Sequence, residues 1–126
     1  MEIKNKWGLD EGSEIWKNLM NLKEKVLDRV EQISGLKITV TSSYRDEETN
    51  RKCGGKPNSQ HLKGEAADIK SADNARIFNI IKTLEFDQLI WEGGDKEQPA
   101  WIHVSLKRDG GNRKQILMIP YVKTYG

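Results

Sequence analysis

The strongest constraint on the fold is an apolar stripe that runs through residues 13–34. Its members recur at steps of three and four residues, and they are Ile15, Leu19, Leu22, Val26, Val30 and Ile33. This spacing predicts one amphipathic helix, because residues three and four apart lie on the same face of a helix. Ser13 is placed to cap the first turn, and Gly35 is placed to end the last one.

The segments that follow alternate between strand-like and helical patterns. Strands are predicted over "LKITVTSS", "EAADIK", "DQLIWE" and "AWIHVSLK". A short polar helix is predicted over residues 45–53, and a second amphipathic helix over "SADNARIFNIIKTLEF", with Ser71 or Asp73 as its cap. "RDGGN" is typical of a hairpin turn from which "KQILMI" returns. We therefore expect an α+β fold in one domain over residues 1–126, with a mainly antiparallel sheet and flanking helices.

Composition and charge exclude several classes of protein. Charged residues make up 32% of the 126 residues and hydrophobic residues 36%, which is typical of a soluble globular protein. The net charge is +2, and no basic stripe of the kind found in nucleic-acid binders is present. The N-terminus lacks the apolar segment of a secretory signal, and no run is long enough for membrane insertion. The single cysteine excludes an internal disulfide. We expect synthesis in the cytoplasm without a signal peptide, and a size sufficient for a monomer.

Strand periodicity brings the two histidines of the chain toward one aspartate. In "AWIHVSL" every second residue is apolar and faces the core, so His103 faces the other side of the sheet. In "EAADIK" the same alternation turns Asp68 away from the core. If the two strands are neighbours, His103 and Asp68 share one open face. His61 reaches this face from the preceding loop, which Gly64 allows to bend back tightly.

Two imidazoles and one carboxylate form a three-ligand zinc set that leaves a fourth position open, as in catalytic sites. Zinc lowers the pKa of a coordinated water from about 16 to about 7 and so supplies hydroxide at neutral pH. The chemistry also needs a base to take a proton and a cation to meet the developing oxyanion. Glu92, at the end of "DQLIWE", is the best candidate for the base, and Arg45, at the end of "TSSYR", is the best candidate for the cation.

Several motifs in the right order resemble a known family. "SQHLKGEAAD" followed by "WIHVS" resembles the SxHxxGxAxD and C-terminal histidine motifs of the M15 zinc peptidases. These are the D-alanyl-D-alanine carboxypeptidases and related bacteriophage endolysins, which share their fold with the hedgehog signalling domain. "TSSYRDEETNRKCGG" is similar to the SxYR…N…GG segment of that family, and "FDQLIWE" to its strand before the last ligand. The resemblance covers residues 13–107 and implies the hedgehog/DD-peptidase fold.

The resemblance also implies roles for individual residues. Carried over by position, it implies zinc ligands at His61, Asp68 and His103. It further implies that Arg45 binds the substrate carboxylate or oxyanion. A structural salt bridge from Arg45 to a nearby acid is the alternative interpretation.

The base transfers less directly from the family pattern. Many members have an acidic residue three positions before the last histidine, where this chain has Ala100. The base is therefore assigned to Glu92, with Glu97 as the alternative. Ser59 is expected to bind substrate or to hydrogen-bond a ligand, unless it only begins a turn. Trp101 is expected to line the substrate cleft, unless it packs under the loop at 93–99.

These residues support two functional hypotheses. The first is a zinc-dependent D,D-carboxypeptidase or peptidoglycan endopeptidase that hydrolyses stem peptides of the bacterial cell wall. The second is a catalytically inactive, zinc-stabilised cell-wall or protein binding module. In that case Ala100 stands where an active relative would have its catalytic base. The sequence leaves open whether the bond is D-Ala-D-Ala, L-Ala-D-Glu or another. It also leaves open whether the protein acts in phage or prophage lysis, after release from the cytoplasm, or in wall remodelling.

Overall fold

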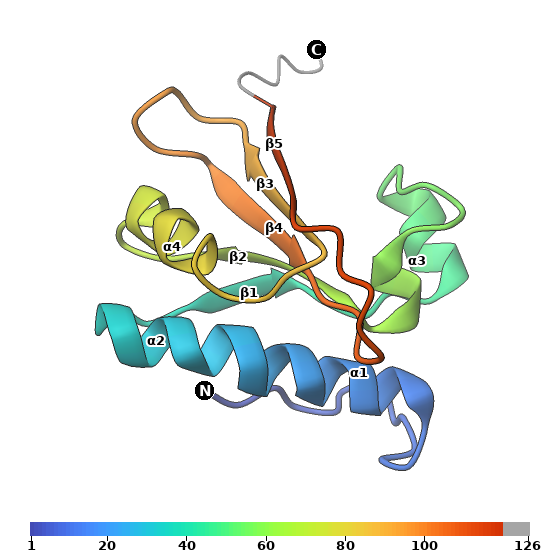
Figure 1. Cartoon of the computed structure of the whole chain (residues 1–126). Coiled ribbons are helices and arrows are strands. Elements are labelled where there is room, and N and C mark those ends of the chain that lie inside the picture. The colour runs from blue at the N-terminus through green and yellow to red at the C-terminus, as the bar shows by residue number, and fades with distance from the viewer. Residues whose placement is uncertain (120–126) are drawn as a thin grey trace.

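A computed structural model describes residues 1–119 and shows a five-stranded sheet with several helices around it (Figure 1). The strands are β1 (Thr39–Ser42), β2 (Ala66–Lys70), β3 (Gln88–Glu92), β4 (Trp101–Ser105) and β5 (Gln115–Ile119). The helical segments are α1 (Glu14–Leu22), the π-helical η1 (Lys23–Leu27), α2 (Asp28–Ser34), α3 (Glu47–Lys52), the 3₁₀ helix η2 (Gln60–Lys63) and α4 (Asn74–Ile81). The predicted α+β fold is confirmed.

The segments α1, η1 and α2 form one continuous helical rod (Figure 1). The predicted ends are confirmed, because Ser13 Oγ accepts the Trp16 N–H and Gly35 ends the rod with a φ of 72°. Leu19, Leu22, Val26 and Val30 of the apolar stripe are buried as expected, Ile15 is partly buried, and Ile33 is 49% exposed. The π-helical turn explains this difference, since its extra residue rotates the rest of the helix. Leu27 and Ser34 are buried in place of Ile33.

The sheet is mixed, with the strand order β1-β2-β4-β3-β5. Neighbouring strands are antiparallel except at one edge, where β5 pairs parallel with β3 and Gln115 lies opposite Gln88. The hairpin predicted at "RDGGN" is therefore wrong. The chain does reverse there, but β2 and β3 already occupy both edges of β4. The returning strand pairs instead with the free edge of β3, and because β3 is antiparallel to β4 this pairing is parallel.

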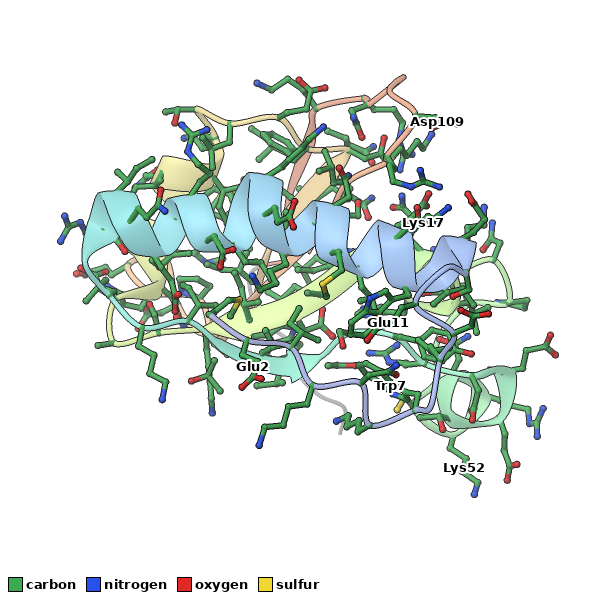
Figure 2. All side chains as sticks on the ribbon, turned by 90° about the horizontal axis from the view of Figure 1, so that it is seen from below. Glu2, Trp7, Glu11, Lys17, Lys52 and Asp109 are labelled. Carbon is green, nitrogen blue, oxygen red and sulfur yellow. The ribbon has the colours of Figure 1, made fainter. Side chains whose placement is uncertain are left out.

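The core lies between the sheet and the layer formed by the helical rod and α4. It includes Leu22 and Val30 from the rod, Ile77 from α4, and Ile69 and Ile102 from the two central strands. Figure 2 shows the rod from below, lying across the strands, with Trp7 of the N-terminal segment near α3. The opposite face of the sheet is bordered by η2 and carries the cleft described below. Among residues 1–119, no helix has both the length and the apolar character that a membrane crossing requires.

Two glycines in left-handed conformation provide a test of the tight turn after His61. Gly64 and Gly35 have φ values of 74° and 72°, but only at Gly64 would an added Cβ lie 2.5 Å from a backbone oxygen, that of Ile15. We expect Gly35→Ala to lower the free energy of unfolding by about 1 kcal/mol, the cost of the left-handed conformation alone. Gly64→Ala should lose a further amount of about 1–3 kcal/mol from overpacking. Urea denaturation measures both losses, and equal losses would contradict close packing at Gly64.

Candidate metal centre

His61, Asp68 and His103 converge on the open face of the sheet. One ligand atom from each residue can be chosen so that all three atoms lie within 4.8 Å of one another. Asp68 Oδ1 lies 3.0 Å from His103 Nδ1, and Asp68 Oδ2 lies 3.4 Å from His61 Nε2. Strands β2 and β4 are neighbours, with Asp68 directly opposite His103. The predicted shared face of Asp68 and His103 is therefore confirmed.

His61 is oriented by the short helix η2 and by a buried hydrogen bond. Ser59 caps η2 by accepting the His61 N–H at 3.1 Å, and Gly64 ends it. The His61 ring is buried, and its Nδ1 lies 2.6 Å from the carbonyl oxygen of Ser43. A carbonyl can only accept a hydrogen bond, so Nδ1 carries the proton. The lone pair of Nε2 is left to face Asp68, which is the arrangement of a metal-ligating histidine.

This set of donors fits a divalent metal ion. Burial alone would raise the pKa of Asp68, but the neighbouring imidazoles of His103 and His61 outweigh burial and hold that pKa well below its usual value. Asp68 is therefore an ionised carboxylate between two imidazoles, and these are the ligand types that zinc takes in proteins. All three residues line a cleft of about 760 Å³, so the centre is open to a ligand from solvent.

Arg45 lies beside the cluster, and its guanidinium is held on three sides. Nη2 donates to Asp68 Oδ2 at 3.2 Å, Nε to Ser42 Oγ at 3.0 Å and Nη1 to Asn50 Oδ1 at 3.4 Å. The Arg45 backbone N–H also donates to the His61 carbonyl at 3.1 Å. Arg45 thus forms a salt bridge with Asp68 while it lines the cleft.

Asn50 is a supporting residue to which the sequence assigned no role. Its side chain is buried, and its Nδ2 donates to the Lys56 carbonyl at 2.8 Å while its Oδ1 receives Arg45. A Cβ at Gly55 would lie only 2.1 Å from Asn50 Oδ1. The asparagine and the glycine belong to "TSSYRDEETNRKCGG", the stretch that carries part of the family resemblance. The N…GG part of this stretch was therefore the sequence pattern from which the contact of Asn50 with Arg45 could have been predicted.

Glu92 and Trp101 form one end of the cleft. They are opposite each other in the β3–β4 register, and Trp101 Nε1 donates to Glu92 Oε2 at 3.1 Å. Burial raises the pKa of Glu92, and the negative charge of Asp68 raises it further. The alternative base, Glu97, is exposed in a turn closed by the Asp95 carboxylate, and it does not line the cleft. Ser59 and Trp101 both line the cleft.

The family comparison agrees with this geometry. A model of the family described as Peptidase M15 matches residues 2–105, and the chain belongs to this family. No curated protein matches the chain. Membership supports a hydrolase of a metal-dependent peptidase family, and the His61, Asp68 and His103 cluster could bind the metal. The matched region includes the whole cluster and ends at the last residue of β4.

Removing Asp68 tests the metal centre. Protein purified without chelator should contain about one divalent ion per chain, and Asp68→Ala should lose most of it, because two imidazoles alone under-coordinate the ion. Elemental analysis measures the content, and circular dichroism checks that the variant is folded. Glu97→Ala, which removes an exposed carboxylate outside the cleft, is the matched control and should retain the metal. Full retention in Asp68→Ala would remove Asp68 from the site.

Proposed function

We propose that this protein is a zinc peptidase that hydrolyses peptide bonds in the stem peptides of bacterial peptidoglycan. The observation that carries the proposal is the convergence of His61, Asp68 and His103 donor atoms, within 4.8 Å of one another, in an open cleft. Two imidazoles and a carboxylate with room for a further ligand are typical of catalytic zinc. The family supports a hydrolase, and the resemblance to wall-lytic members supports stem peptides as substrates.

His61, Asp68 and His103 would hold the zinc ion. When bound there, zinc polarises a carbonyl and lowers the pKa of a coordinated water from about 16 to about 7. The Ser43 carbonyl keeps the His61 Nε2 free for the ion. Asp68 is oriented by both histidines and by Arg45, so its carboxylate is held in place before substrate binds.

Glu92 is proposed as the general base and acid. Its Oε2 is occupied by the Trp101 indole, which leaves Oε1 to accept a proton from the attacking water and pass it to the leaving nitrogen. Partial burial raises the pKa of Glu92 above its ordinary value, and a raised pKa makes a carboxylate a better base. Trp101 thus has a positioning role in addition to lining the cleft.

Arg45 and Ser59 are proposed to bind the substrate. A guanidinium has five N–H groups. Three nitrogens of Arg45 each use one N–H on Ser42, Asn50 and Asp68, which leaves two N–H groups for a substrate carboxylate or the developing oxyanion. The Ser59 oxygen accepts the His61 N–H, and its own hydroxyl hydrogen remains free to donate to the substrate.

Purified peptidoglycan provides the direct test of this function. Incubation with the protein should release new amino groups, a chelator should stop the release, and added zinc should restore it. Release that is unaffected by the chelator would contradict a metal-dependent mechanism. If no amines appear but the protein sediments with peptidoglycan in a zinc-dependent manner, the chain is the binding module instead.

The base assignment is tested by a pair of isosteric substitutions. We expect Glu92→Gln to lower turnover about 100-fold or more, the usual contribution of a positioned acid–base group, and to leave zinc bound because Glu92 is not a ligand. Glu97→Gln is the matched control and should be far milder. Amine release and zinc content are measured on both variants. A loss in Glu97→Gln with near-normal Glu92→Gln would move the base to the 93–99 loop.

A further inference from the structure

A second charged cluster lies at the end of the cleft away from Glu92. The Asp87 carboxylate is fully buried and accepts Arg113 through Nε at 3.1 Å, Nη2 at 2.8 Å and the backbone N–H at 2.9 Å. Lys107 Nζ lies 3.9 Å from the same carboxylate. All three residues are among those that line the cleft. These three side chains together carry one net positive charge, and Glu85 accepts a hydrogen bond from Asn112 Nδ2 of the same loop at 3.2 Å.

The loop between β4 and β5 holds the two cations side by side. The Lys107 N–H donates to Asn112 Oδ1 at 2.8 Å, and Asn112 Nδ2 donates back to the Lys107 carbonyl at 3.3 Å. The Gln115 N–H then donates to the Asp87 carbonyl at 2.9 Å, where β5 begins. The side chains of Lys107 and Arg113 are 37% and 52% exposed. Their charged ends therefore remain open to a ligand, although the backbone beneath them is fixed.

Strand register gives the distance of this cluster from the metal centre. In the β3–β4 register, Ile90 lies opposite His103. Asp87 is three residues before Ile90, and its backbone N–H donates to the Ser105 carbonyl, which continues the pairing of the two strands. At a rise of about 3.3 Å per residue, Asp87 lies about 10 Å from the level of His103, and Glu92 lies about 7 Å away in the other direction. An extended peptide covers about 10 Å in three residues.

The proposed function gives the cleft a direction. Glu92 passes its proton to the leaving nitrogen, so the part of the substrate after the scissile bond lies toward Glu92. The part before the bond then runs toward Lys107 and Arg113. We propose that Lys107 and Arg113 form a specificity subsite that binds a carboxylate of an acidic peptide substrate, about three residues before the scissile bond. The direction of this assignment rests on the proposed function.

The cluster is suited to selecting substrates rather than to the reaction itself. It lies several residues from the metal centre along the strands, and Lys107 and Arg113 follow the region that matches the family model, which ends at residue 105. Arg113 neutralises the buried Asp87 at 2.8 Å, while Lys107 Nζ lies 3.9 Å from the same carboxylate. Lys107 is therefore the cation that can be removed without leaving a buried charge unpaired.

The test uses stem peptides synthesised in pairs that differ only in a free carboxylate or its carboxamide at one position. The position is scanned over four residues on each side of the bond cleaved in the peptidoglycan assay. We expect the parent to prefer the carboxylate member only near the third residue before the bond. Lys107→Met should raise KM for that peptide about 5-fold, the upper worth of an exposed ion pair, with kcat unchanged. The carboxamide peptide should be unaffected.

Lys70→Met, at the end of β2 and outside the cleft lining, is the matched control and should change neither KM. An equal rise in KM for both members of the pair would overturn the proposal, as would a carboxylate preference only after the bond. Calorimetric titration of the same pairs into zinc-loaded Glu92→Gln protein separates this inference from the proposed function. A carboxylate preference in binding that Lys107→Met abolishes supports the subsite even if no hydrolysis occurs. Hydrolysis without any such preference refutes the subsite alone.

Discussion

The carboxylate of Asp68 is the group on which the rest of the cleft depends. A largely buried carboxylate is costly unless its oxygens are paired, and those of Asp68 pair with His103 and Arg45, while His61 Nε2 lies 3.4 Å from Oδ2. Each partner comes from a different segment: η2, β4 and the stretch after β1. The contacts that stabilise the charge therefore also fix three parts of the chain relative to one another. The candidate metal centre and Arg45, the arginine proposed to bind substrate, are ordered by the same two oxygen atoms.

The strands of the sheet hold Asp68 and His103 in fixed positions, whereas His61 and Arg45 come from segments outside the strands. Register places Asp68, His103 and Ile90 in one row across β2, β4 and β3. Side chains on neighbouring strands have little freedom to shift, which suits a site whose geometry must be held closely. His61 and Arg45 come from less regular segments, and further hydrogen bonds hold their side chains in place. The His61 imidazole bonds to the Ser43 carbonyl, and the Arg45 guanidinium bonds to Asn50.

Features set by local backbone geometry were predictable from the sequence, and features set by packing were not. The two-residue period of a strand is intrinsic, so the common face of Asp68 and His103 followed from the alternation alone. The exposure of Ile33 depends on a π-helical turn whose position no periodicity marks. The partner of β5 depended on which sheet edge was free. The pair of Asp87 and Arg113, 26 residues apart, leaves no local pattern at all.

The edge position of β5 would make the proposed chemistry and the proposed choice of substrate separable along the chain. The three candidate metal ligands, Arg45 and Glu92 all precede residue 106, while residues 107–119 reach the sheet through a single strand partner, β3. This last segment contributes both a charged end and an apolar stretch, Leu117 and Ile119, to the cleft wall. Exchanging it between related enzymes is thus a natural route, for evolution or for protein engineering, to new selectivity on an unchanged catalytic core.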